Sequence, residues 1–157
     1  MTPKSLLNHP QAVSHLEDFL DETAFQEIIP DHHEFDNPER VNRVIFCSGK
    51  VYYDLLTHRE EDNIKHAAIV RVEQLYPLDA EGIKMATSPY ASAKKFIWCQ
   101  EEPLNMGAWS FIQPRLERIT KSRVRYAGRD RASSPSTGSK AVHKREQKML
   151  VKKAFSV

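Results

Sequence analysis

Four short apolar runs follow one another after Val41, and stretches with helical spacing lie between them. The runs are residues 44–47, 67–72, 96–99 and 124–127. Runs of this length and composition are typical of strands that are buried on both faces of a parallel sheet. Their alternation with helices predicts an α/β fold, a three-layer Rossmann-like domain with a mostly parallel sheet covered on both faces.

The predicted helices are residues 51–59, 79–89, 108–120 and a last helix that begins after Ser139. Asp79 and Ser139 are residue types that cap the starts of helices. Pro114 predicts a kink in the third helix, because proline removes a backbone donor. Trp109 shares the helical spacing of the apolar residues that follow it, so we expect its ring in the core.

Residues 1–40 lack this alternation and are interpreted as a lead-in to the α/β domain of residues 41–157. Ser14 and Glu17 have the spacing of a capping box, which predicts a short helix after them. Residues 30–38 contain two prolines and no hydrophobic period. That composition predicts an exposed connector.

The composition is that of an ordinary folded domain, with 40% hydrophobic and 28% charged residues. No apolar run approaches the roughly 20 residues of a membrane helix, and the N-terminus lacks the apolar core of a secretory signal. We therefore expect a cytoplasmic protein without a membrane partner. The initial methionine suggests a cloned fragment or a truncated reading frame.

Cys47 and Cys99 each end an apolar run. A reducing cytosol favours buried free thiols at such positions, and a disulfide or redox pair is the alternative. The seven histidines show no metal-ligand spacing, so we expect no metal site.

Charge is distributed unevenly, although the net charge is only +2. Residues 1–40 hold nine acidic and two basic side chains, whereas residues 121–157 hold eleven basic and two acidic ones. The two ends can neutralise each other or neighbouring surfaces, or the basic end can form a phosphate pocket. Nucleic-acid binding has the least support, because the last helix carries a single aromatic residue, Phe155.

The turn Ser48-Gly49-Lys50 lies where a strand passes into a helix. Free backbone amides and the helix dipole favour an anion there, although an ordinary turn is the alternative and the spacing of a P-loop is absent. Arg71 lies within a predicted strand and must face solvent or be paired. Glu73 and Glu101 are its possible partners, and ligand binding is the other interpretation.

The loop 128–139 combines arginines, hydroxyls and glycines ahead of a helix. Such groups form phosphate pockets, although a flexible surface loop has the same composition. The candidate effector or phosphate site therefore consists of Ser48, Lys50, Arg71, Arg129, Ser136 and Ser139.

Glu101 and Glu102 are adjacent, so on an extended chain they point in opposite directions. That geometry argues against a catalytic pair of carboxylates, and we predict no catalytic residue in this chain. We expect one of the two to be buried and paired with Arg71 or His143. Together with Asn105 and Trp109 they form a predicted structural or interface group.

Three stretches have distinctive sequences: CSGKVYYDLL (47–56), IVRVEQLYP (69–77) and WCQEEPLNMGAW (98–109). With them the chain resembles the C-terminal domain of 2-oxoglutarate dehydrogenase, the thiamine-dependent decarboxylating component. The resemblance covers nearly the whole chain and implies a fold similar to the C-terminal domain of transketolases.

The resemblance implies that thiamine diphosphate and magnesium are bound by two preceding domains of the full-length enzyme, and that this chain alone holds no cofactor. The implied partners are those domains, a second subunit of a homodimer and the succinyltransferase component of a tricarboxylic acid cycle complex. AMP or acetyl-CoA is the implied effector. A free-standing nucleotide- or acyl-CoA-binding regulatory module is the alternative.

Overall fold

A five-stranded sheet forms the centre of the chain, with the strand order β1-β3-β2-β4-β5. The structure, a computed structural model, describes residues 3–20 and 23–157. The four predicted strands are confirmed, and they are parallel to one another: β2 (Arg43–Cys47), β3 (Ala67–Val72), β4 (Lys95–Pro103) and β5 (Val124–Arg129).

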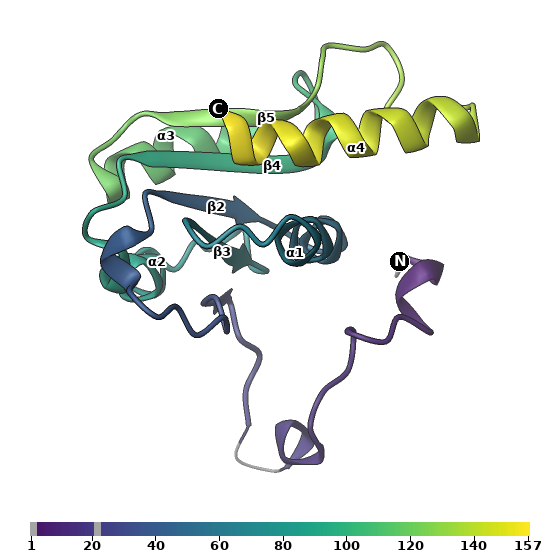
Figure 1. The fold of residues 1–157 in the computed structure, drawn as a ribbon. Helices are drawn as coiled ribbons and strands as arrows, with labels where there is room; N and C mark the ends of the chain where they lie inside the picture. Colours follow the sequence, from purple (N-terminus) through teal and green to yellow (C-terminus); the bar gives the residue numbers. More distant parts are fainter. Residues whose placement is uncertain (1–2, 21–22) are drawn as a thin grey trace.

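Two helices cover each face of the sheet, which confirms the three predicted layers (Figure 1). One face is covered by α1 (Val51–Glu61) and α4 (Lys140–Ser156), and the other by α2 (Ala80–Thr87) and α3 (Trp109–Thr120). The described ranges also contain four short 3-10 helices: η1 (Lys4–Leu6), η2 (Leu16–Phe19), η3 (Pro38–Arg40) and η4 (Ser88–Tyr90). Among the described residues, no helix is both long and apolar enough to cross a membrane.

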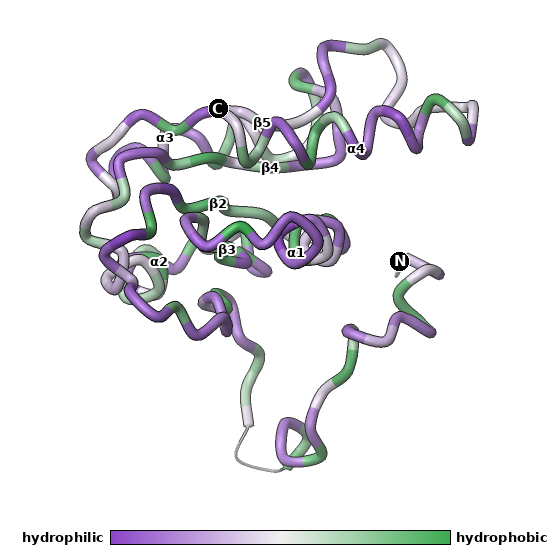
Figure 2. Tube along the Cα trace, viewed as in Figure 1, coloured by the Kyte–Doolittle hydropathy of each residue, from purple (hydrophilic) through white to green (hydrophobic). Residues whose placement is uncertain are grey.

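The core is split into two halves by the sheet. Val44 and Phe46 of β2 face α2 and α3, while Ile45 and Cys47 face α1 and α4. All five residues of β2 are buried, as expected for a central parallel strand. Figure 2 shows hydrophobic residues along the central strands and a mixture of both kinds along α4.

The helix ends agree in part with the sequence. The carboxylate of Asp79 accepts a hydrogen bond of 2.9 Å from the backbone N–H of Gly82, so it caps α2 as predicted. Ser139 occupies the capping position of α4, but its side chain makes no capping hydrogen bond. The helix α3 continues through Pro114 to Thr120.

A fifth strand was not predicted. β1 (Ile28–Ile29) pairs antiparallel with β3, with Ile28 opposite Val72 and Ile29 opposite Arg71. Two residues are too short to produce a recognisable period, so this strand lies inside the segment that the sequence assigns to the lead-in.

The predicted exposed connector is also anchored to the domain, by Asp31 and by Phe35, whose ring lies 5.7 Å from that of the buried Tyr90. The side chain of Asp31 is 1% exposed and forms an ion pair with Arg59 of α1. Its carboxylate also accepts a 2.7 Å hydrogen bond from the backbone N–H of Ile69 in β3. The interpretation of residues 30–38 as fully exposed was therefore wrong at Asp31, because a charged partner arrives from a distant helix.

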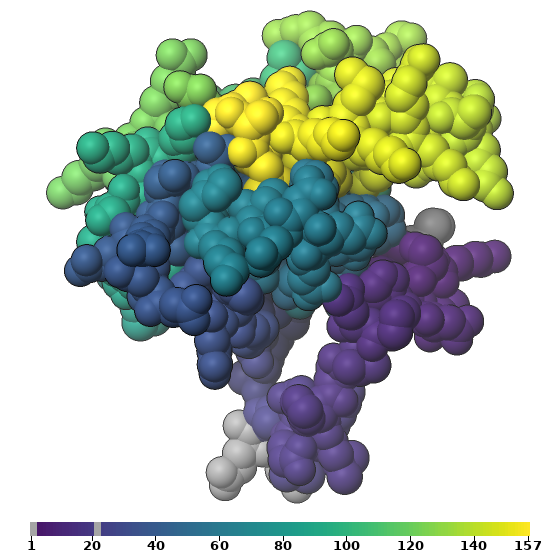
Figure 3. Space-filling view, in the orientation of Figure 1, coloured from purple at the N-terminus to yellow at the C-terminus, as the bar shows by residue number. Residues whose placement is uncertain are grey.

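The arm, residues 3–20 and 23–27, leaves the body of the domain (Figures 1 and 3). It contacts α1 near its start, where the rings of His9 and Tyr53 lie 4.8 Å apart. Its predicted short helix is the 3-10 helix η2, and the capping residue is His15, not Ser14. The carboxylate of Asp18 accepts the His15 N–H at 2.9 Å, which shifts the predicted capping box by one residue.

Both cysteines are free and fully buried, as predicted. Burial raises the pKa of the Cys47 thiol and of the Cys99 thiol, which keeps both protonated at neutral pH. We expect a thiol reagent at pH 8 to modify neither cysteine in the folded chain and both in guanidinium. Rapid modification of one thiol in the native state would show that its side of the core is open.

Candidate functional site

The carboxyl ends of the parallel strands bring most of the candidate residues to one edge of the sheet. The turn after β2 contains Gly49, whose φ of +68° is a left-handed conformation that glycine adopts readily. This turn points its Gly49 N–H at a carboxylate oxygen of Glu73, 3.3 Å away. The protein's own carboxylate therefore occupies the place that the sequence analysis assigns to a phosphate.

Lys50 lies between two carboxylates. Its Nζ is 3.0 Å from Oδ2 of Asp54 and 2.9 Å from Oε1 of Glu101. Burial alone would lower the pKa of Lys50, but the hydrogen bond and charge of Glu101, and those of Asp54, raise it above its ordinary value. The side-chain amide of Gln147 on α4 donates to both carboxylates, at 2.8 and 3.0 Å.

This cluster corrects the expected partner of Glu101. Arg71 or His143 is the predicted partner, whereas Glu101 pairs with Lys50 in the structure. The reason is the parallel register, which places the end of β4 beside the turn after β2. Arg71 pairs with Glu73 instead, the other predicted partner, at 2.9 Å, and its guanidinium lies over the ring of Tyr52 at 4.6 Å.

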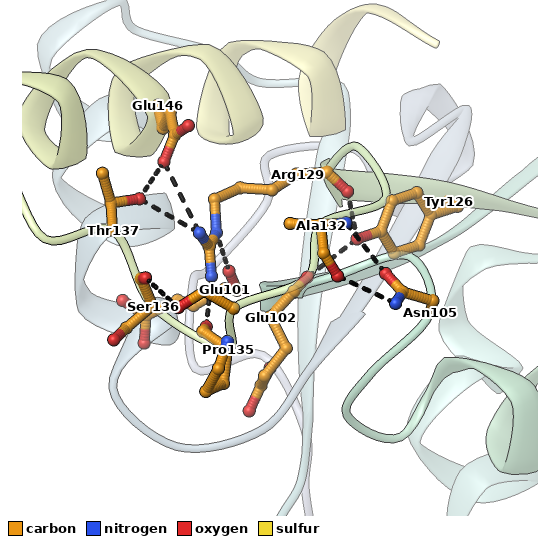
Figure 4. Close-up of polar contacts among 11 residues, drawn as sticks. Glu101, Glu102, Asn105, Tyr126, Arg129, Ala132, Pro135, Ser136, Thr137 and Glu146 are labelled. Atoms are coloured by element: carbon orange, nitrogen blue, oxygen red, sulfur yellow. Dashed lines mark hydrogen bonds and ion pairs between the residues drawn. The ribbon is translucent and has the colours of Figure 1, made fainter.

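Arg129 at the end of β5 fastens the following loop to the sheet (Figure 4). Its Nε donates to the carbonyl of Glu101 at 2.8 Å, and Nη1 donates to Oγ1 of Thr137 at 3.0 Å. Nη2 donates to the carbonyl of Pro135, and Glu146 of α4 lies 3.6 Å from Nη1. The guanidinium is thus surrounded by acceptors from β4, the loop and α4.

The three candidate serines are less engaged. Ser48 lines a cleft of about 440 Å³ between the strand ends and α3. Ser136 and Ser139 are exposed, and in the described part of the chain neither hydroxyl donates to another candidate residue. The structure therefore groups Ser48, Lys50 and Arg71 around one turn, and Glu101 connects this group to Arg129.

The turn that follows β4 is organised by Gln100, a residue that the sequence analysis does not select. Gln100 is 4% exposed, and its Oε1 accepts from Nε1 of Trp98 at 2.9 Å and from the N–H of Trp109 at 3.0 Å. Its Nε2 donates to the carbonyl of Met106 at 2.7 Å. The sequence offers one signal for the role of Gln100, a polar residue directly after the buried run of residues 96–99.

Other residues of the predicted structural group connect this turn to the loop after β5. Asn105 exchanges two hydrogen bonds with the backbone of Ala132, at 3.0 and 3.1 Å. The carbonyl of Glu102 accepts from the hydroxyl of Tyr126 at 2.8 Å, while the Glu102 side chain is exposed. Both contacts lie within the network of Figure 4.

Trp109 is only partly buried, and its ring lies 5.2 Å from that of Tyr126. The ring packs against the core, as expected, but it is not fully enclosed, because Trp109 occupies the first position of α3, where the helix meets the turn. We expect Trp109→Ala to cost about 1–2 kcal/mol of unfolding free energy, less than a fully buried tryptophan. Chemical denaturation of this variant beside Trp98→Ala tests the difference, since Trp98 is 1% exposed.

The strand edge does not fit the magnesium diphosphate of a thiamine cofactor. Its carboxylates, Asp54, Glu73 and Glu101, are each bound to a lysine or arginine. In the described ranges no three His, Cys, Asp or Glu side chains lie together in a way that could hold a metal ion.

Comparison with known proteins gives one consistent result. Residues 13–155 match the family described as 2-oxoglutarate dehydrogenase C-terminal. The chain is 48% identical to the 2-oxoglutarate dehydrogenase E1 component of Haemophilus influenzae, over 99% of the chain and 17% of that protein.

The corresponding protein of Azotobacter vinelandii is 41% identical over 100% of the chain and 17% of its own length. The mitochondrial 2-oxoglutarate dehydrogenase of Caenorhabditis elegans is 44% identical over 99% of the chain and 16% of its length. The chain thus spans about one sixth of these relatives. It belongs to the 2-oxoglutarate dehydrogenase C-terminal family.

Proposed function

We propose that this chain is an assembly domain that completes a 2-oxoglutarate dehydrogenase E1 polypeptide and has no catalytic activity alone. In that proposal thiamine diphosphate and magnesium are held by the remaining domains. The complete protein is a homodimer that passes a succinyl group to a succinyltransferase in the tricarboxylic acid cycle. We also propose a cytoplasmic location. The relatives include both bacterial and mitochondrial proteins.

The exposed apolar side chains of the arm carry this proposal. Leu16 and Phe19 of η2 are 78% and 74% exposed, and Val13 is 77% exposed. Several large apolar side chains exposed on one segment mark a protein-protein contact. Since the relatives are about six times longer, the simplest cover for the arm is the rest of such a polypeptide.

The test mixes this chain with the Haemophilus influenzae E1 component truncated before the region that matches it. Analytical ultracentrifugation is expected to detect a complex of the two proteins. The double substitution Leu16→Ser and Phe19→Ser should weaken that complex strongly. Met85→Ser is the matched control, because Met85 is 69% exposed but lies on α2. Equal binding of all three proteins would overturn the proposed role of the arm.

We further propose that the strand edge senses an anionic effector, AMP or acetyl-CoA. Lys50, Arg71 and Arg129 supply the positive charge, and Ser48, Ser136 and Ser139 supply hydroxyls. The support is the arrangement of the acceptors, since carboxylates of Asp54 and Glu101 already bind Lys50 and that of Glu73 binds Arg71. A phosphate would have to replace carboxylate contacts, which makes occupancy dependent on ionic strength.

Arg129→Ala is the substitution that tests the effector proposal. It should weaken binding of a phosphate-bearing effector by roughly 1.5–3 kcal/mol, the range for hydrogen bonds to charged groups. Isothermal titration with AMP and acetyl-CoA at low salt measures this loss. Arg131→Ala removes the same charge from the same loop and should leave affinity unchanged. Unchanged affinity of Arg129→Ala would remove Arg129 from the site.

The same titration separates the assembly domain from the free-standing regulatory module. A module of that kind binds an adenine ligand at full strength without a second protein. An assembly domain whose site is completed by the rest of the polypeptide gains affinity when the truncated E1 component is added.

A further inference from the structure

A second hollow lies on the other side of Arg129, between the loop after β5 and α4. This β5–α4 groove has a volume of about 580 Å³. It is lined by residues 128–132 and by seven residues of α4, among them Arg145, Met149, Lys152 and Lys153. The strand order places it at the β5 edge of the sheet, whereas the arm leaves from the β1 edge.

The cations of this groove differ from those of the strand edge in having no acidic partners. Arg131, Arg145 and Lys152 are exposed, and Lys153 lies over the ring of Tyr126 at 5.4 Å. Within residues 3–20 and 23–157 no carboxylate lies at ion-pair distance from any of these four.

The carboxylates that line the groove do not cancel its charge. Glu146 is bound to Arg129, and Asp130 is the other acidic residue of the lining. Nor does the acidic arm reach it. Among the described residues the only ion pair of the first forty positions joins Asp31 to Arg59 on α1. The groove therefore keeps an excess of positive charge that the chain itself does not neutralise.

The groove also offers apolar contact. Met149 is 64% exposed in its lining, and Leu150 is buried beneath it. An exposed methionine is a common feature of surfaces that accept varied apolar side chains. The positive groups lie at the ends of long, flexible side chains around Met149 and Leu150. This arrangement favours an extended acidic segment that carries an apolar side chain between its acidic side chains.

We propose that the β5–α4 groove binds an acidic, leucine-containing segment of a partner protein. This docking site borders the proposed effector site at Arg129, which lines both, and it lies at the opposite edge of the sheet from the arm. The carboxylates of the segment bind Arg131, Arg145, Lys152 and Lys153, and its apolar side chain packs on Met149. Nucleic acid is a weaker match, because the ring of Tyr126 beside the cations is covered by Lys153 and the ring of Phe155 is buried.

The test uses the full chain and fluorescent nine-residue peptides of alternating glutamate and leucine, measured by fluorescence anisotropy. Arg145→Gln combined with Lys152→Gln should weaken binding about fivefold to tenfold, as expected for two rim charges. Lys140→Gln combined with Lys144→Gln is the control, since these exposed residues of α4 lie outside the groove lining. The control pair should change affinity less than twofold.

Two further measurements separate the proposed partner from other anions. A peptide with serine in place of leucine should bind more weakly to the native chain, and Met149→Ser should remove that difference. The proposal is overturned if no peptide binds, or if both pairs of lysine and arginine substitutions weaken binding equally. It is also overturned if inorganic triphosphate or a short RNA displaces the peptide at lower concentration than unlabelled peptide does.

Discussion

Replacing Asp31 with alanine is expected to lower the free energy of unfolding by about 3–5 kcal/mol, the usual cost of removing one partner of a buried ion pair. The side chain of Arg59 is only 5% exposed, so its charge would remain buried without a counter-ion. The backbone N–H of Ile69 would lose its acceptor as well. Because only Pro30 separates Asp31 from β1, the substitution also releases β1 from the sheet edge.

Urea denaturation measures this effect, and two other variants isolate its cause. Asp36→Ala removes an exposed carboxylate from the same segment and should change stability by less than about 0.5 kcal/mol. The double variant Asp31→Leu and Arg59→Met should be more stable than Asp31→Ala alone, since it leaves no buried charge. Equal losses for Asp31→Ala and Asp36→Ala would show that the ion pair contributes nothing.

Gln100→Leu is expected to cost about 3–5 kcal/mol, because leucine leaves several groups without hydrogen-bond partners at about 1–3 kcal/mol each. The groups that lose their hydrogen-bond partner are Nε1 of Trp98, the N–H of Trp109 and the carbonyl of Met106. The turn between β4 and α3 would lose the side chain around which it folds. Its contact with the loop after β5, through Asn105, should loosen with it.

Tryptophan fluorescence reports the structural effect of this substitution locally. The two tryptophans of the chain are Trp98 and Trp109, and both donate a hydrogen bond to Gln100. We expect a red-shifted emission before global unfolding in Gln100→Leu. Gln74→Leu is the control, since Gln74 makes one exposed side-chain hydrogen bond, to the carbonyl of Pro77. A stability loss below 1 kcal/mol in Gln100→Leu would contradict the central place of Gln100.

The sequence predicts well those strands that consist of a continuous apolar run, because the run itself identifies the strand. Residues 44–47 are all apolar, and such a run has few alternatives to a central strand. β1 escapes prediction because its two residues acquire strand geometry only from β3. The same holds for Asp31, whose burial depends on Arg59, which lies 28 residues further along the chain.

The candidate site shows the same division between local and distant information. Residue types alone identify the turn at Ser48-Gly49-Lys50 and the arginine at 129 as polar features of the strand ends. Which acid neutralises which base depends on register, and Glu101 meets Lys50 only because β4 and β2 are neighbours. Charge counts predict a basic C-terminal end, but only the fold distinguishes its paired arginine from the unpaired cations of the groove.

Restoration of activity is the most direct test of the central claim, that this chain completes a longer E1 polypeptide. The truncated Haemophilus influenzae E1 component is mixed with this chain, and decarboxylation of 2-oxoglutarate is followed with thiamine diphosphate and magnesium present. We predict activity in the mixture, none from the chain alone, and a large loss when the arm carries Leu16→Ser and Phe19→Ser. Decarboxylation by the chain alone, or a mixture no more active than the truncated protein, would contradict this account.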